Sequence, residues 1–349
     1  MSNFKLFYVP GPLRILLAFG AVAAVGGLLA TLELPPVETV QRGFRGLAMV
    51  QNYHPSTFAK TVAENQPPAA IGAPLLVGGP AGKVYKNVQV LKDVPVAEFT
   101  RLMASITTWV APEQGCTYCH VDTSNLASDD LYTKKVARRM LQMVLDINTN
   151  YKTHVASSGP TGATGVTCYT CHRGNPVPKN IWFTAPPEPG NALGYTGGRN
   201  KPTAAVGLTS LEVDPFTPYY LGSDPIRLTP STALPTGTST ASFKAAYWSY
   251  GVMINMSQSL GVNCTYCHNT RQFSDWSQST PQRATAWYGL QMVRHLNNDY
   301  LVPLTSTFPA NRLGATGDAP KVYCATCHNG VYKPLFGANI VKDYPELTK

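Results

Sequence analysis

Charged side chains are scarce in this chain, and no cysteine lies outside one short motif. Asp, Glu, Lys and Arg make up 13% of the 349 residues, about half of the ~25% that is usual in soluble domains. A low charge content is typical of a protein that buries cofactors or large interfaces. The net charge of +9 is not gathered into a basic cluster, so the sequence gives no indication of nucleic-acid binding.

All the cysteines belong to four copies of a Cys-x-x-Cys-His motif. The thiols are Cys116, Cys119, Cys168, Cys171, Cys264, Cys267, Cys324 and Cys327, and the histidines are His120, His172, His268 and His328. Two thiols at this spacing can add to the two vinyl groups of one haem, while the adjacent histidine becomes the fifth ligand of the iron. The motifs therefore predict four covalently bound haem c groups. Zinc sites and disulfides are the alternatives, but neither needs a histidine after every second cysteine.

The N-terminal region contains an apolar run that is long enough to cross a membrane. Ile15–Leu32 carries no charged residue, and we expect a transmembrane anchor at 13–33. Basic residues precede the run and acidic residues follow it, which places residues 1–12 in the cytoplasm and the bulk of the chain in the periplasm. A cleaved signal peptide is the alternative, but the run is longer than a typical signal core. No cysteine stands directly after the run, so a lipoprotein anchor is excluded.

The sequence contains an internal duplication. The stretch 141–151 (LQMVLDINTNY) matches 290–300 (LQMVRHLNNDY), and Cys-Thr-Tyr-Cys-His occurs at both 116–120 and 264–268. Each half has a helix, a motif, a second helix and a second motif. We therefore expect a mainly α fold with long irregular segments, arranged as a pseudo-two-fold multihaem cytochrome c with two haem-binding helix units per half.

The predicted organisation follows from helical periodicity and from the distribution of Pro, Gly, Ser and Thr. Apolar residues recur at helical spacing over 99–110 and 134–150, with weaker counterparts at 250–257 and from about 283. Beyond the anchor we expect an extended periplasmic linker at 34–96, a first dihaem half at 97–175, a connecting segment at 176–242, a second dihaem half at 243–332 and a C-terminal tail at 333–349.

Each haem iron needs a sixth ligand or keeps an open position. Met103 and Met253 lie on the helices before the first and third motifs, at about the same distance from the motif histidine, 17 residues before His120 and 15 before His268. The second haem has two candidates, Met140 and Met143. The duplication matches Met143 with Met292, but it matches Met140 with Gly289. The fourth haem would then need another ligand, and His154 is a candidate among the three histidines outside the motifs.

These motifs and the stretches around them resemble the four-haem cytochrome subunit of purple-bacterial photosynthetic reaction centres. The most specific matches are 136–141 (VARRML), 166–174 (VTCYTCHRG), 260–269 (LGVNCTYCHN) and 280–284 (TPQRA). The resemblance implies Met103, Met140 and Met253 as methionine ligands, and a bis-histidine haem held by His154 and His328. It also implies that Arg283 lies between the third haem and the bacteriochlorophyll special pair.

The resemblance implies electron transfer rather than catalysis. The chain would take electrons from a soluble cytochrome c or a high-potential iron–sulfur protein. It would pass them to the photo-oxidised special pair, while bound to the L and M subunits at the inner, photosynthetic membrane. A membrane-anchored multihaem quinol dehydrogenase or reductase, or a freestanding periplasmic redox relay, is the alternative. Acidic residues near the first motif suggest a negative docking surface for a basic donor; they are Glu113, Asp122, Asp129 and Asp130.

Overall fold

The described part of the chain is mainly helical. The computed structural model describes residues 10–31, 37–42, 49–155, 164–186, 202–228 and 241–348. Its α-helices are α1 (Gly11–Thr31), α2 (Pro55–Glu64), α3 (Ala81–Val84), α4 (Val96–Val110), α5 (Tyr132–Asn150), α6 (Lys152–Val155), α7 (Cys168–His172), α8 (Phe243–Leu260), α9 (Pro281–His295) and α10 (Cys324–His328). Two strands, β1 (Glu38–Arg42) and β2 (Met49–Tyr53), form one antiparallel pair.

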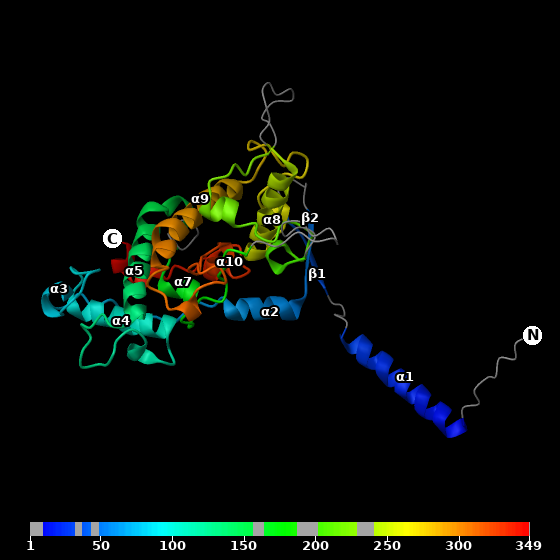
Figure 1. Ribbon diagram of the computed structural model, residues 1–349, viewed down its shortest axis with the longest axis horizontal. Coiled ribbons are helices and arrows are strands. Elements are labelled where there is room, and N and C mark those ends of the chain that lie inside the picture. Colours follow the sequence, from blue (N-terminus) through cyan, green and yellow to red (C-terminus); the bar gives the residue numbers. More distant parts are fainter. Residues whose placement is uncertain are drawn as a thin grey trace, which may run out of the picture.

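Helix α1 extends away from the rest of the molecule (Figure 1). It has 21 residues and none of its side chains is buried. At about 1.5 Å per residue its length is about 31 Å, which matches the ~30 Å hydrocarbon core of a bilayer. The helix therefore fits a membrane anchor, and it begins and ends two residues earlier than the predicted 13–33.

The four long helices predicted from periodicity are confirmed. Helix α4 precedes the first motif and α5 the second, while α8 precedes the third and α9 the fourth. One core gathers around α4 and α5, with Leu102 and Trp109 almost fully buried. A second core lies under α8 and α9 and includes Val252 and Leu290. The first core includes Cys168 of the second motif, and Cys324 of the fourth motif packs against the second core.

The C-terminal residues are not the tail that the sequence suggested. Short helices at Val341–Asp343 and Pro345–Thr348 place Leu347 and Tyr344 in the first core. The Tyr344 ring packs edge-on against Trp109 of α4, with the ring centres 4.6 Å apart. The side chain of Asn148 in α5 donates to the carbonyl of Leu347 at 2.8 Å. Segments this short show no helical periodicity in the sequence. Contacts with helices that are distant in the chain determine their positions.

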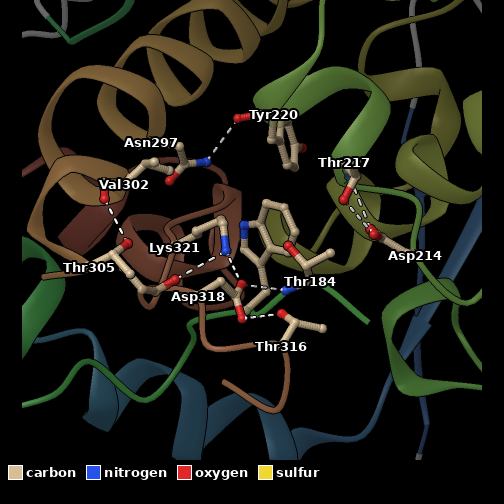
Figure 2. A network of polar contacts seen from close by, with 12 residues as sticks. Thr184, Asp214, Thr217, Tyr220, Asn297, Val302, Thr305, Thr316, Asp318 and Lys321 are labelled. Carbon is tan, nitrogen blue, oxygen red and sulfur yellow. Dashed lines mark hydrogen bonds and ion pairs between the residues drawn. The ribbon is translucent and has the colours of Figure 1, made fainter. Parts of the chain in front are cut away.

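The connecting segment 176–242 also contributes to the core where the structure describes it. A single helical turn, η3 (Thr217–Leu221), buries Tyr219 and Tyr220 in the second core. Figure 2 shows polar contacts between residues of this segment and residues of the second half. The ammonium of the buried Lys321 pairs with Asp318, whose carboxylate also accepts from the backbone N–H of Thr184 at 2.8 Å. A Lys321 charge buried without this carboxylate would be costly.

The linker 34–96 is more ordered than an extended linker. Strands β1 and β2 pair in register from Glu38 opposite Tyr53 to Arg42 opposite Met49. Helix α2 follows, and Asn65 at its end is fully buried. The amide of Asn65 donates to the carbonyl of Asn329, just beyond the fourth motif. An isolated two-stranded pair is marginal in water, so tertiary contacts must support it.

Equivalent positions of the two repeats meet in the structure. His295 is the counterpart of Asp146, and its Nε2 lies 2.7 Å from the Asp146 carboxylate. Cys171 and Cys327 are the second cysteines of the second and fourth motifs, and their sulfur atoms lie 2.7 Å apart. In a two-fold arrangement, equivalent residues meet at the axis. These contacts place the ends of α5 and α9, and the motif helices α7 and α10, at the junction of the halves.

Candidate functional site

All four motifs open into one continuous cavity. Its volume is about 2180 Å³, which exceeds the ~300–1,000 Å³ of an ordinary single-ligand pocket. The lining includes the eight motif cysteines, the four motif histidines and five further predicted site residues, namely Met103, Met140, His154, Met253 and Arg283. The structure therefore brings together every predicted site residue. His54 and His295, the other two histidines outside the motifs, do not line this cavity.

Each motif histidine is oriented by a backbone carbonyl that follows it in the chain. The Nδ1–O distances are 3.0 Å for His120 with Leu126, 2.9 Å for His172 with Asn175, 2.9 Å for His268 with Phe273 and 3.0 Å for His328 with Val331. A carbonyl oxygen only accepts, so Nδ1 carries the proton and Nε2 keeps its lone pair. Such second contacts orient imidazoles that bind metal. All four imidazoles are thus prepared to bind iron through Nε2.

Burial keeps these imidazoles neutral, which is the form that binds iron. It lowers the pKa of His120, His172 and His268. Burial, with the neighbouring His154, lowers the pKa of His328 to about 4. A buried imidazole loses its charged form because desolvation of the cation is unfavourable.

The local sequence gives the motifs two different backbone forms. In α7 the hydroxyl of Thr170 accepts from the backbone N–H of Thr167 at 3.0 Å, and in α10 Thr326 does the same for Tyr323. This capping makes short α-helices of the second and fourth motifs. The first and third motifs have Tyr at that place, and they form 3₁₀ turns, η1 (Gly115–Tyr118) and η4 (Cys264–Tyr266).

The predicted methionine ligands project from three long helices toward the same cavity. Met103 lies on α4, Met140 on α5 and Met253 on α8, and all three line it and are only partly buried. Met143, the alternative to Met140, also lines the cavity, but it is 8% exposed and belongs to the first core. The position of Met140 is therefore the more accessible one for a ligand.

His154 lies beside the histidine of the fourth motif. It belongs to the short helix α6, which directly follows α5. The ring centres of His154 and His328 are 6.2 Å apart, and the ring planes are inclined at 65° to each other. Nδ1 of His154 lies 2.9 Å from the carbonyl oxygen of Thr285 in α9. His154 is thus held like the motif histidines, with Nε2 left available.

Gly289 makes room for this histidine. A Cβ atom at position 289 would lie 2.4 Å from Cε1 of His154, closer than such atoms approach. The counterpart of Met140 in the second half must therefore lack a side chain. Glycine at position 289 thus leaves the space that the His154 ring from the other half occupies.

One of the four acidic residues near the first motif is compensated within the fold. Asp129 pairs with Arg138 at 2.8 Å and with Lys134 at 3.3 Å. These contacts hold the pKa of Asp129 well below its usual range, with the Arg138 hydrogen bond as the largest cause. The predicted contribution of Asp129 to a docking surface is therefore wrong, because its charge is compensated within the fold. Glu113, Asp122 and Asp130 remain exposed.

Sequence reasoning missed the role of the segment after the anchor. Strand β2 lies against the third motif, and Asn65 lies between the ends of the second and fourth motifs. Arg173, just after the second motif, donates to the Asn65 side chain at 2.9 Å and to the carbonyl of Cys327 at 3.0 Å. No periodic signal in residues 34–96 identified these contacts.

The cavity, its paired thiols and its oriented imidazoles fit covalent haem, and they define the chain as a c-type cytochrome. Residues 33–348 match the family model of the photosynthetic reaction centre cytochrome c subunit. Proteins with that name are 53% identical in Rubrivivax gelatinosus, over 92% of this chain and 86% of the relative, and 48% identical in Thermochromatium tepidum, over 92% and 78%. The relative from Roseobacter denitrificans is 39% identical over 97% of this chain and 93% of its own length.

The chain belongs to the family of photosynthetic reaction centre cytochrome c subunits. It is an electron-carrier subunit and not an enzyme. Membership in this family decides for covalently bound haem c and against zinc or disulfides.

Proposed function

We propose that the chain conducts electrons from a soluble periplasmic carrier, through four haem c groups, to the photo-oxidised bacteriochlorophyll pair bound by the L and M subunits. The observation that carries the proposal is the single cavity onto which all four attachment motifs open. Bound haem supplies a one-electron carrier at each motif. The protein sets each potential through the axial ligands, burial and neighbouring charge.

The ligand set that we propose has three methionines and one additional histidine. His120, His172, His268 and His328 are the fifth ligands, while Met103, Met140 and Met253 serve the first three motifs. His154 serves the fourth motif, and its 6.2 Å ring separation from His328 supports this pairing. With every position filled, no iron is left open to substrate.

We propose a pseudo-two-fold arrangement of the four haem groups, with the halves at 97–175 and 243–332. The contacts of Asp146 with His295 and of Cys171 with Cys327 support it, because each joins equivalent positions. The haems of the second and fourth motifs would then lie nearest the axis. Those of the first and third motifs would lie at the two ends of the row.

The third motif would face the membrane. Residues 32–37 separate α1 from β1, and a chain of this length spans at most about 25 Å. Strand β2 in turn bonds to the loop of the third motif. Helices α3 and α4, which lead to the first motif, lie at the end of the body opposite α1 (Figure 1). This geometry supports electron entry near the first motif and exit near the third.

Arg283 would adjust the potential of the third haem, from which electrons would pass to the special pair. It lies in the first turn of α9 and lines the same cavity as Cys267 and His268. Its guanidinium lies over the Trp276 ring, 4.1 Å from the centre, and donates to the Ser279 hydroxyl at 2.7 Å. A fixed positive charge at this place favours the reduced haem and raises its potential.

A mild-detergent purification tests the proposed function. The chain should copurify with proteins that bind bacteriochlorophyll, and the absorption spectrum should show both pigments. A short flash should then oxidise haem in the purified complex. Haem spectra without any bacteriochlorophyll would instead favour a freestanding relay.

The apolar N-terminal segment should be retained in the mature subunit. Its 21 exposed helical residues carry one charge, on Arg14 near the N-terminal end, and they fit a bilayer better than a short signal core. Intact-mass measurement of the purified subunit should therefore include residues 1–33, with or without Met1. A mature mass that begins near residue 34 would contradict the anchor.

The donor surface near the first motif should depend on two exposed acids. Asp122→Asn combined with Asp130→Asn should slow re-reduction by a basic cytochrome about two- to tenfold at low salt, because long-range attraction raises encounter rates. The difference should shrink at high salt, where screening is strong. Flash-induced kinetics would measure it, with Asp275→Asn near the third motif as the control.

Equal rates in the variant and the wild type at low salt would point to apolar docking. Val121 and Leu126, each 47% exposed beside the first motif, would then be the contact residues. Asp129 is left unchanged in this experiment because its removal would unpair Lys134 and Arg138.

A further inference from the structure

The first and third motifs have the same five residues but different surroundings. In the first motif Cys116 and Thr117 are exposed. The Thr117 hydroxyl donates only within its own turn, to the carbonyl of Gln114 at 2.9 Å. In the third motif the equivalent Thr265 is fully buried. The sequence of the motif itself therefore does not set its exposure to water.

Strand β2 is what covers the third motif. The backbone N–H of Met49 donates to the Thr265 hydroxyl at 3.4 Å, and the Asn263 amide donates to the Met49 carbonyl at 3.0 Å. The Gln51 amide adds a bond to the carbonyl of Gly261 at 2.8 Å. Side chains of the motif loop thus bind both backbone groups of Met49.

Asn263 joins this cover to the motif. Its side-chain oxygen accepts from the backbone N–H of Thr265 at 3.1 Å and from the Thr265 hydroxyl at 2.7 Å. The same amide group holds Met49 through its nitrogen. The first motif has Gly115 at the equivalent position, and a glycine has no side chain with which to hold a strand. The difference between the motifs therefore begins one residue before the first cysteine.

We infer that Asn263 and Thr265 are positioning residues that hold β2 over the third motif, and that this cover raises the potential of the third haem by excluding water. The inference rests on the proposed function, because it assumes a haem at that motif. The oxidised haem carries more positive charge than the reduced haem, and water stabilises the greater charge. A site that is shielded from water therefore favours the reduced form.

Two matched variants test the inference in the full-length, haem-loaded chain in detergent. Thr265→Val keeps the shape of the side chain but removes the hydroxyl that accepts from Met49. Thr117→Val makes the same change in the first motif, where neither of the two described strands is bound. Hydrogen exchange of peptides covering 49–53 measures how firmly β2 is held over the third motif. A redox titration followed by spectroscopy measures the midpoint potential of each haem.

Thr265→Val should speed exchange at Met49 about fivefold, the ratio expected for one lost hydrogen bond. It should also lower one high midpoint potential. Thr117→Val should change neither quantity. Asn263→Gly, which gives the third motif the residue that precedes the first, should produce a larger change in both, because it releases the strand and the turn together.

Equal shifts for Thr265→Val and Thr117→Val would overturn the inference, and so would faster exchange at 49–53 with all midpoints unchanged. A wild-type titration with fewer than four haem transitions would contradict the proposed function instead. The two failures are therefore distinguishable.

Discussion

Replacing His154 with methionine should raise the lowest of the four midpoint potentials and leave the other three nearly unchanged. His154 faces His328 and is the only histidine outside the motifs that lines the cavity. Methionine stabilises reduced iron better than imidazole does. The expected rise is on the order of 0.1 V, within the ~0.8 V range that axial ligands span. A spectroscopic redox titration of the purified subunit would measure it.

Met140→His is the reciprocal control for this assignment. It should convert one high-potential haem into a second low-potential haem, because α5 directs position 140 into the same cavity. Met143→Leu should leave all four potentials close to those of the wild type, since Met143 belongs to the core. An unchanged lowest step in His154→Met would show that another residue is the ligand of the fourth haem.

Gly289→Ala should open the fourth haem to an external ligand. The added methyl group would lie 2.4 Å from the His154 ring, so the ring must move away. Replacing glycine with alanine in a helix interior ordinarily stabilises a protein by about 0.5–1 kcal/mol. A lower stability of Gly289→Ala would therefore indicate the collision with His154. We expect carbon monoxide to bind one haem in the reduced variant and none in the wild type. Absorption difference spectra would detect it.

A double variant separates this collision from general misfolding. If Gly289→Ala acts through His154, then adding it to His154→Ala should change carbon monoxide binding no further. Gly26→Ala in α1 is the control for the substitution itself, because nothing lies within 4 Å of its added methyl group. Carbon monoxide binding by the wild type, or none by Gly289→Ala, would contradict the proposed role of Gly289.

The sequence determined the elements that repeat or have a period. The four motifs, the apolar anchor and the long helices α4, α5, α8 and α9 were all readable, because each follows from local spacing. The contrast between Met140 and Gly289 predicted a different ligand for the fourth haem, and in the structure His154 lies against Gly289. In each case the chemistry depends on residues that are close in the chain.

Only the tertiary structure decided the positions and roles of residues whose partners are distant in the chain. Leu347 enters the core because α4 and α5 provide the matching surface, and Asp129 loses its role as a free acid because Arg138 folds back onto it. His154 reaches His328, 174 positions further along the chain, because the two halves meet at equivalent residues. Strand β2 covers the third motif and not the identical first motif, because the third motif is preceded by Asn263 and the first by a glycine. Contacts of this kind are set by the packing of whole elements, and local sequence spacing does not encode them.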